Sequence, residues 1–361
     1  MRIAIFAGGS GRRLWPISRQ SSPKQFEPIV GELSTLQLAM ERVAPQYGYD
    51  NIFVATNERY GEIICRQLPE LPPTNIIFEP ARRDLGPAVG LAMAHLAADG
   101  VDEPVAILWS DNYIENNAAF ADLLRIAEQL IVEQNARIIF IGETPRFANE
   151  NLGWIGLGEQ KGAIDDTPYF GFESLTYRPS LEYCRAIFEQ GTHVWNTGFF
   201  VTTPKYIQQL YKRFSPDMWL QLQEIESSIG TAAYRDILAR VYPQMQIISF
   251  DDAILTHIDP EDAVVLHSEM GWSDPGTLYA LKEAINSDRD ANVIKGLVID
   301  TESEDCLIYN YESGKILMAI GLEGMIVINT DDAILVVHKD QIPLVKKVVD
   351  ELQDTDLESY S

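Results

Sequence analysis

The sequence predicts an α/β protein in which a mostly parallel sheet is flanked by helices and followed by a small C-terminal β domain. Two observations support this prediction. Over the first 115 residues, short apolar runs alternate with segments of helical spacing, which is the pattern of a parallel sheet wrapped by helices. From Gly296 onward, short apolar runs follow one another with only turns between them, which indicates a separate β domain.

The first part of the chain supplies the predicted parallel strands and their helices. Apolar runs predict buried strands at residues 3–6, 52–55, 76–78 and 105–108. Apolar residues recur at helical spacing over residues 36–43 and 88–98. Ligands of such sheets bind beyond the carboxyl ends of the strands, so the loops that follow these runs are the first place to look for a site.

The middle of the chain is less regular. Residues 138–142 predict a further strand, and residues 143–200 mix turn residues with short aromatic runs. We interpret this region as strands and loops that line a pocket, with strands within residues 151–158 and 193–201. Residues 204–240 are mostly helical by spacing and are expected to pack on the outside of the sheet.

The C-terminal part is predicted to be a small β-rich domain, residues 289–361, that follows a catalytic domain of residues 1–288. Its apolar runs lie at residues 297–299, 306–309, 316–319, 325–328 and 333–337. Turns this frequent are compatible with a few coils of a β-helix or with a compact sandwich. A helix is expected within residues 341–353, followed by a frayed acidic tail.

Composition excludes several classes of function. The chain has 361 residues, 53 of them acidic and 28 basic, and its formal net charge of -25 argues against binding nucleic acid. No apolar run approaches the roughly 20 residues that cross a bilayer, so we expect no membrane association. The three cysteines are far apart and fit a reducing compartment, so a cytoplasmic protein with buried, unpaired cysteines is expected.

The most informative stretch follows the first predicted strand. It contains three glycines, Gly8, Gly9 and Gly11, and then two arginines, with Lys24 shortly downstream. Backbone amides exposed by such a loop, beside cationic side chains, suit a substrate that carries phosphate. A glycine-rich loop on its own is weak evidence, because many tight strand-to-helix turns need glycine for steric reasons. The spacing matches neither the P-loop nor the dinucleotide-binding fingerprint.

This stretch, Gly-Gly-Ser-Gly-Arg-Arg-Leu-Trp-Pro at 8–16 with Pro-Lys-Gln-Phe at 23–26, closely resembles the signature of sugar-1-phosphate nucleotidyltransferases. Its Trp-Pro and Pro-Lys-Gln-Phe forms are most similar to those of mannose-1-phosphate guanylyltransferases. Further blocks follow in the family's order at residues 79–88, 110–114, 153–155, 195–198 and 271–276. The resemblance covers the whole chain, since residues 321–327 and 331–336 are similar to the β appendage of those enzymes.

The resemblance implies a Rossmann-like nucleotidyltransferase fold, a C-terminal β domain for which a short left-handed β-helix is one candidate, and synthesis of GDP-mannose from GTP and mannose 1-phosphate. By resemblance, Mg²⁺ is held by Asp111 and Asp274, which act in catalysis with Arg13 and Lys24. The implied nucleotide-binding residues are Gly8, Gly9, Ser10, Gly11, Arg12, Arg13, Lys24, Arg83 and Ser110. Those implied for the sugar phosphate are Gly153, Arg178 and Asn196. Appendages of this kind usually join subunits, which implies a homodimer.

Several residues have a simpler interpretation when taken alone. Asp111 and Asp274 each suit a turn or a helix cap, and Trp154 and Trp195 are expected to be core aromatics rather than sugar platforms. The five histidines form no pair with ligand or base spacing, and an ionised phosphate nucleophile needs no base.

The chain also departs from the family pattern. Tyr177 replaces a usual glutamate, Thr256 and His257 replace a usual Glu-Lys pair, and Asn112 replaces a usual histidine. Asp-Leu-Gly at 84–86 stands where the family usually has Asn-Thr-Ala. Two alternatives therefore stay open: an enzyme for another nucleoside triphosphate or another hexose or heptose 1-phosphate, and a catalytically weak relative that binds a nucleotide sugar as a regulator.

Overall fold

The computed structural model describes residues 1–9, 14–19, 21–286, 288 and 290–360. The predictions for Ser10, Gly11, Arg12 and Arg13 fall outside these residues. The chain packs as two compact units. Unit 1 comprises Met1–Gly8, Met40–Trp109 and Ile114–Met270, and unit 2 comprises Gly9–Ala39, Ser110–Tyr113 and Gly271–Ser361.

Unit 1 is built on a nine-stranded sheet with the strand order β3-β2-β1-β4-β8-β5-β9-β7-β6, in which β8 also pairs with β6. Its strands are β1 (Arg2–Phe6), β2 (Ile52–Asn57), β3 (Ile76–Glu79), β4 (Val105–Trp109), β5 (Ile138–Glu143), β6 (Gly153–Ile164), β7 (Thr167–Tyr177), β8 (His193–Thr202) and β9 (Ala263–Ser268). The five strands predicted from apolar runs up to residue 142 are all present, each one or two residues longer than predicted.

Helices connect these strands. They are α1 (Thr35–Tyr47), α2 (Gly61–Gln67), α3 (Leu85–Ala97), α4 (Asn117–Val132), α5 (Leu181–Gln190), α6 (Pro204–Phe214), α7 (Pro216–Glu226), α8 (Tyr234–Val241) and the short α9 (Phe250–Ala253). The predicted helices at 36–43, 88–98 and 204–240 are confirmed. Local sequence explains where several begin, because the side chains of Asn116, Ser180 and Thr203 each accept a backbone hydrogen bond from the first turn of the next helix.

The pairing of the sheet changes along the chain. β1 to β4 are mutually parallel, as predicted. Ile3 of β1 lies opposite Ile52 of β2 on one side and opposite Ala106 of β4 on the other. Strands from the middle region add antiparallel pairs, including the hairpin of β6 and β7 and the pairs that β8 makes with β4, β5 and β6. The parallel strands are apolar on both faces because helices cover both sides of the sheet.

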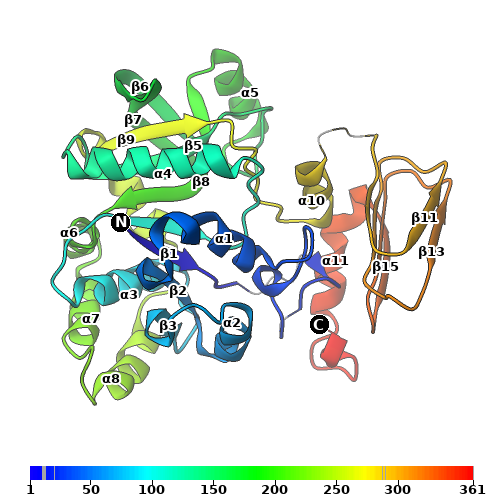
Figure 1. Ribbon diagram of the computed structural model, residues 1–361, viewed down its shortest axis with the longest axis horizontal. Coiled ribbons are helices and arrows are strands. Elements are labelled where there is room, and N and C mark those ends of the chain that lie inside the picture. The colour runs from blue at the N-terminus through cyan, green and yellow to red at the C-terminus, as the bar shows by residue number, and fades with distance from the viewer. Residues whose placement is uncertain (10–13, 20, 287, 289, 361) are drawn as a thin grey trace. The chain divides into compact units, whose positions relative to one another are not determined.

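Helices pack on the sheet through almost wholly apolar surfaces. In α3 every residue from Gly86 to Leu96 except His95 is buried, and α3 lies against α6 and α7 (Figure 1). On another side of unit 1, α4 packs against β5, β8 and β9 (Figure 1). A single cluster of buried side chains joins α3, α6, α7, α8 and α9 to the sheet.

The region predicted as strands and loops at 143–200 contains a helix that the prediction missed. Helix α5 begins at the Ser180 cap and ends at Gly191, whose positive φ of 66° suits glycine. Only Cys184 and Ile187 of this helix are buried, so its apolar periodicity is too short to identify it from sequence. The strands predicted within 151–158 and 193–201 are confirmed as parts of β6 and β8.

Unit 2 contains the predicted C-terminal β domain. Parallel strands β10 (Val293–Lys295), β12 (Leu307–Asn310) and β14 (Met325–Asn329) form one sheet with the antiparallel β15 (Ile334–His338). The parallel pair β11 (Val298–Thr301) and β13 (Leu317–Ile320) forms a second sheet. Each of the five predicted apolar runs lies within or overlaps a strand, and the alternation between two parallel sheets follows the β-helix alternative rather than the sandwich.

Two helices and one apolar core complete unit 2. We call residues 8–29, which contain both signature motifs, the signature segment. Helices α10 (Leu278–Ile285) and α11 (Ile342–Asp350) pack with its residues Leu14, Ile17 and Ile29 and with inward-facing residues of the β domain. The acidic tail is not frayed as expected, because residues 358–360 form a 3-10 turn and the Tyr360 carbonyl accepts hydrogen bonds from Trp15 and Arg19. The predicted boundary after residue 288 stays a prediction.

The cysteines are all unpaired, but Cys65 is exposed, which corrects the expectation that all three are buried. It lies on the solvent side of α2, where only Ile64 is buried. Within the described ranges, no helix is both long enough and apolar enough to cross a bilayer.

Candidate active site

The central feature of unit 2 is a buried lysine between two carboxylates. The Nζ atom of Lys24 lies 3.5 Å from Oδ2 of Asp111 and 3.4 Å from Oδ1 of Asp274. The Lys24 side chain is 6% exposed, whereas those of Asp111 and Asp274 are 44% and 47% exposed. Three residues that the sequence analysis placed in one site, up to 250 positions apart, are therefore brought together within one compact unit.

A short backbone bridge holds the two aspartates near each other. Tyr113 and Ser273 form an isolated antiparallel bridge in which each backbone N–H donates to the other residue's carbonyl at 3.0 Å. Asp111 lies two residues before this bridge and Asp274 one residue after it. The bridge therefore brings the backbone of the two segments together without using the side chains of the aspartates.

Asn112 has a structural role that explains its difference from the family's usual histidine. Its side chain is buried, and its Oδ1 accepts a hydrogen bond of 3.3 Å from the Trp272 indole. Trp272 is itself almost fully buried beside the bridge. The pair gives the two loops a second connection, which sequence reasoning missed because its members are 160 residues apart.

Lys24 is placed by a short 3-10 turn, η2 (Lys24–Phe26), that follows Pro23. All three residues of this turn are buried, and the side chain of Phe26 is almost completely so. A buried ammonium is stable only when it is paired, and the two carboxylates supply that pairing. The partly exposed oxygens of Asp111 and Asp274 remain accessible to a ligand from solvent.

The donor set fits a hard divalent cation. Two carboxylates converge on one point and, in the described part of the chain, no group of three or more histidine, cysteine or acidic side chains is arranged to hold a metal. Mg²⁺ binds proteins through one or two carboxylates and completes its shell with phosphate oxygens and water. A pair of aspartates therefore fits a metal that a phosphate-bearing substrate brings with it.

Other predicted nucleotide-binding residues are divided between the units. In unit 2, Gly9 lies beside Gln25, and the Ser110 side chain is buried directly before Asp111. In unit 1, Gly8 lies two residues after the end of β1, and a Cβ added to it would lie 3.8 Å from Oε1 of Glu79. The roles assigned to these residues stay predictions.

Glu79 is a buried acid that the sequence analysis did not single out. Its Oε2 accepts a hydrogen bond of 2.6 Å from Tyr242, which is fully buried. Burial raises the pKa of Glu79, although the hydrogen bond from Tyr242 opposes that rise. Nothing in the sequence near Glu79 could reveal a partner 163 residues away.

The block at 79–88 also explains one departure from the family pattern. Gly86 donates its N–H to the Ile248 carbonyl at 2.9 Å, and an added Cβ would lie only 2.8 Å from the same oxygen. Any larger residue there would displace the backbone of residue 248. Arg83, a predicted nucleotide-binding residue, donates from Nη2 to the Pro243 carbonyl, while its buried Nε has no hydrogen-bond partner within the described residues.

The predicted sugar-phosphate residues form a row across three strands of unit 1. Asn196 on β8 is opposite Gly153 on β6, and Gly153 is in turn opposite Tyr177 on β7. An added Cβ on Gly153 would lie 3.2 Å from the Cβ of Asn196. Arg178 follows Tyr177 with a positive φ of 48° and stacks its guanidinium over that tyrosine ring, 5.0 Å from the centroid.

Two tryptophans are core residues, as expected. Trp154 and Trp195 are both almost fully buried and pack edge to face with centroids 6.3 Å apart. Trp154 donates its indole N–H to the Asn149 carbonyl. These rings support the strands that carry Gly153 and Asn196.

Comparisons with known proteins find matches over nearly the whole chain. The sequence model of the family described as "Nucleotidyl transferase" matches residues 3–291, and that of the "MannoseP isomerase/GMP-like beta-helix domain" matches residues 296–352. The chain is 31% identical to the mannose-1-phosphate guanylyltransferase RfbM of Salmonella typhimurium over 99% of this chain and 73% of that protein. It is equally similar to an Escherichia coli mannose-1-phosphate guanylyltransferase, covering 74% of that protein.

A solved structure shares the same fold over nearly its full length. It is a Thermus thermophilus protein described as a mannose-1-phosphate geranyltransferase, with a TM-score of 0.86 and 26% identity, over 98% of this chain and 99% of that one. Enzymes of the matched family act on a nucleoside triphosphate and a sugar 1-phosphate and use a divalent metal. The resemblance found in the motifs is thus confirmed, and the chain belongs to the nucleotidyl transferase family, with a β-helix domain at its C-terminal end.

Proposed function

We propose that this protein transfers the guanylyl group of GTP to mannose 1-phosphate, giving GDP-mannose and pyrophosphate, with Mg²⁺ as the metal. The relatives named for this activity support the substrates. The observation that carries the proposal is the convergence of Asp111 and Asp274 on Lys24 of the signature segment. Two carboxylates for a metal and one cation for phosphate are the groups that this reaction needs.

The reaction joins two anions without a covalent enzyme intermediate. A phosphate oxygen of the sugar 1-phosphate attacks the α-phosphorus of GTP, and the bond from that phosphorus to the bridging oxygen breaks so that pyrophosphate leaves. The attacking phosphate is ionised at neutral pH, so no side chain has to remove a proton. Bound Mg²⁺ would neutralise phosphate charge and orient the α-phosphate.

The protein's own residues would bind and orient the reactants. Asp111 and Asp274 would hold the metal, and Lys24 would turn from the carboxylates toward the triphosphate as its charge arrives. Arg13, from the same signature, is proposed for the same triphosphate. The backbone of Gly153 and the side-chain amide of Asn196 would bind the sugar hydroxyls. Arg178 would bind the phosphate of the sugar.

A coupled assay tests the proposal. Purified protein with GTP, mannose 1-phosphate, Mg²⁺ and pyrophosphatase is expected to release phosphate and to yield GDP-mannose by mass spectrometry. A panel of four nucleoside triphosphates and several sugar 1-phosphates distinguishes another substrate pair. Stabilisation by a nucleotide sugar in a thermal-shift screen, without turnover of any pair, would instead support the regulatory relative.

We further propose a cytoplasmic homodimer joined through the β domain. Outward-facing residues of β11 and β13 form an exposed uncharged row, Ile299, Met318 and Ile320, while the intervening Ala319 points into the core. Exposed apolar rows of this kind mark contact surfaces. Because the chain has a net charge of -25, two copies repel each other least where their contact surfaces carry no charge. Light scattering after gel filtration is expected to give the mass of a dimer for the wild type. The double variant Met318→Lys, Ile320→Lys is expected to have the mass of a monomer. A wild-type monomer would contradict this.

A further inference from the structure

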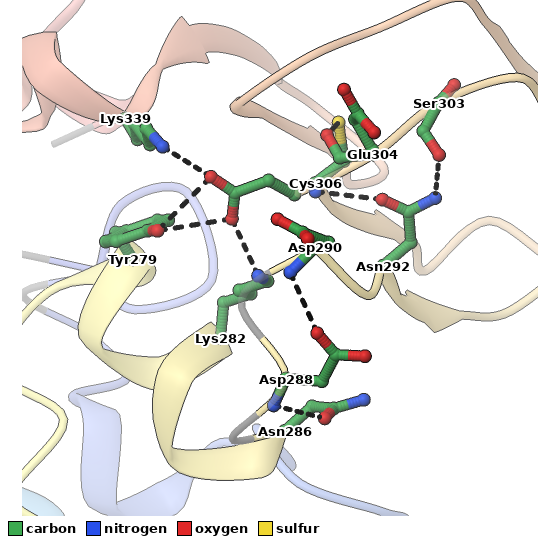
Figure 2. Close-up of polar contacts among 11 residues, drawn as sticks. Tyr279, Lys282, Asn286, Asp288, Asp290, Asn292, Ser303, Glu304, Cys306 and Lys339 are labelled. Carbon is green, nitrogen blue, oxygen red and sulfur yellow. Dashed lines mark hydrogen bonds and ion pairs between the residues drawn. The ribbon is translucent and has the colours of Figure 1, made fainter.

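A second buried charge cluster lies in unit 2, away from the aspartate pair. The carboxylate of Asp305 accepts hydrogen bonds from Lys282 and Tyr279 of α10, at 2.6 Å from Nζ to Oδ1 and 3.1 Å from Oη to Oδ1. Lys339, which follows β15, bonds the other carboxylate oxygen. Figure 2 shows Tyr279, Lys282 and Lys339 pointing toward this one carboxylate from two different elements.

The cluster is costly to break. The Lys282 side chain has no exposed surface, and the Asp305 side chain is 11% exposed. Although burial opposes the shift, hydrogen bonds from Lys282 and Lys339 lower the pKa of Asp305, so the carboxylate stays ionised. Any movement of α10 away from Asp305 would separate two buried charges that are paired in the folded protein.

The backbone at Asp305 is specialised for this contact. Asp305 has a positive φ of 54°, an unusual conformation for a residue with a side chain, although aspartate tolerates it better than most. Its N–H donates to the Asp290 carbonyl at 2.9 Å, and the adjacent Cys306 N–H donates to the Asn292 side chain (Figure 2). The β domain thus presents the Asp305 carboxylate from a fixed turn immediately before β12.

Helix α10 connects this cluster to the proposed metal site. The Asp274 carbonyl accepts a hydrogen bond of 2.7 Å from Gly276, and the Thr277 side chain then caps α10. Leu278 and Leu281 of α10 lie in the apolar core of unit 2 with Leu14 and Ile17 of the signature segment. Apolar contacts tolerate small rotations and slides, whereas the paired Tyr279 and Lys282 contacts fix one orientation of the helix.

We propose that Lys282 and Asp305 are positioning residues for Asp274: their ion pair locks α10 against the β domain and so holds the Asp274 carboxylate next to Asp111. Neither residue belongs to the proposed metal-binding pair. The inference rests on the proposed function for the identity of the metal-binding pair. It gives the β domain a role in the reaction in addition to any role in assembly.

Two matched substitutions at the same cluster test the proposal. Lys282→Met keeps the aliphatic stem but removes the ion pair between α10 and Asp305, so that only the neutral Tyr279 hydrogen bond still joins them. Lys339→Met removes the other cation from the same carboxylate and leaves the Lys282 ion pair in place. Binding of Mn²⁺, used as the probe for Mg²⁺, is followed by the electron paramagnetic resonance signal of the free ion. Thermal unfolding by circular dichroism is recorded for each variant, so that binding is compared only where all are folded.

The proposal predicts that the Mn²⁺ dissociation constant rises about tenfold in Lys282→Met, as is usual when an outer support of a metal ligand is removed. It should change by less than about twofold in Lys339→Met, whose partly exposed ion pair contributes little. Should Lys282→Met fail to fold, Asp305→Asn takes its place; asparagine suits the positive φ and keeps an acceptor oxygen but loses the charge. The same direction of change is expected.

The result that overturns the inference is an unchanged dissociation constant in the folded Lys282→Met protein, or an equal rise in both lysine variants. The inference is also overturned if the Asp274→Asn protein binds Mn²⁺ with the same dissociation constant as the wild type. Failure of the proposed function looks different: wild-type protein would form no nucleotide sugar, whatever the pattern of Mn²⁺ binding among the variants.

Discussion

At the scale of single residues, Lys24 is the side chain whose surroundings say most about the chemistry. Its ammonium lies where two carboxylates converge, so it balances their charge in the protein alone. A divalent cation that binds the same carboxylates must compete with this ammonium. Metal and triphosphate are therefore expected to bind together. The metal takes the two carboxylates from Lys24, and the phosphates then pair with the Lys24 ammonium in their place.

This competition predicts the effect of removing the charge. Lys24→Met should bind Mn²⁺ more tightly than wild type when no nucleotide is present, by about tenfold, because roughly 1.4 kcal/mol of favourable ion pairing no longer has to be broken. The same variant should lose turnover, since the triphosphate loses its cation. Titration calorimetry checks the first effect, and weaker or equal Mn²⁺ binding would contradict the competition.

Asp111 offers a cleaner test of the metal pair. Its side chain is almost half exposed, so Asp111→Asn should change the unfolding midpoint little. Turnover should fall by about 100-fold or more, as when a group that stabilises transition-state charge is removed. Asp331→Asn, on an exposed turn, is the matched control. Unchanged turnover in Asp111→Asn would remove this residue from the site.

Single residues also mark the limit of prediction from sequence. Lys24, Asp111 and Asp274 could be selected from motifs, since each lies in a block of characteristic residues. Their contact with one another, the Tyr113–Ser273 bridge and the Trp272–Asn112 hydrogen bond could not, because they join segments that are far apart in the chain. Pairings of this kind depend on the fold and leave no local pattern.

At the scale of secondary-structure elements, the row across β7, β6 and β8 is the feature that we propose contacts the sugar. The register places Asn196 beside a glycine, which leaves its amide uncovered on that side. Tyr177, which replaces the family's usual glutamate, is exposed and stacked with Arg178 instead of offering a carboxylate. Choice of sugar is therefore expected to depend on these three strands.

A small substitution tests this row. Gly153→Ala would bring a methyl group 3.2 Å from the Cβ of Asn196, so the asparagine must shift. We expect the KM for the sugar phosphate to rise about tenfold, while the KM for GTP stays within about twofold. Gly314→Ala, at a glycine with open space around it, is the control and should change neither constant. Equal effects on both substrates would argue against a sugar-specific row.

The contact between α3 and α8 predicts a pH dependence of stability. Burial lowers the pKa of His95 to about 4, and its Nε2 lies 2.7 Å from the Tyr234 hydroxyl. The unfolded chain, with a histidine pKa near 6.5, binds a proton that the folded protein excludes, so this residue's contribution to stability is lost as pH falls from about 6.5 to about 4. The loss is roughly 3 kcal/mol across that window.

Glu79 and Asp251 have pKa values raised by burial and act in the opposite direction, so the histidine effect has to be isolated by difference. Urea unfolding of wild type and His95→Gln at several pH values provides that difference. The wild type should lose its advantage over the variant as the pH falls through this window. A constant difference between pH 7 and pH 4 would contradict the assignment.

The elements were predicted well where burial makes long apolar runs and poorly elsewhere. β1, β4, β5 and α3 are almost wholly buried, and β2 mostly so, so their sequences show clear patterns. Helix α5 buries only two side chains, and β7 is half exposed along most of its length, so neither produces a strong signal. Pairing between strands in the 143–200 region depends on register and could not be read from composition.

At the scale of the whole molecule, the signature segment and the C-terminal domain share one core. Leu14 and Ile17 pack with Leu278 and Leu281 of α10 and with inward residues of the β domain, such as Leu307, Ile326 and Ile328. Sequence patterns separate these segments because they lie at opposite ends of the chain. Packing joins them, so the β domain supports the residues around Lys24 and Asp274.

This shared core predicts that the first 288 residues will not act alone. Their expression should give protein that aggregates or binds no Mn²⁺, because removal of the β domain exposes Leu14, Ile17 and the inner face of α10. Gel filtration and Mn²⁺ binding check the fragment against the whole chain. A soluble, monodisperse fragment with full turnover would show that the signature segment does not need the β domain.

The central claim is that this protein makes a nucleotide sugar at the Asp111–Asp274 pair. The most direct measurement is mass-spectrometric detection of GDP-mannose formed from GTP and mannose 1-phosphate with Mg²⁺, by wild type and by Asp274→Asn. We predict product with the wild type, none after chelation of the metal, and a loss of about 100-fold or more in the variant. Absence of any nucleotide sugar with every triphosphate and sugar phosphate tried, or full activity in Asp274→Asn, would contradict the account.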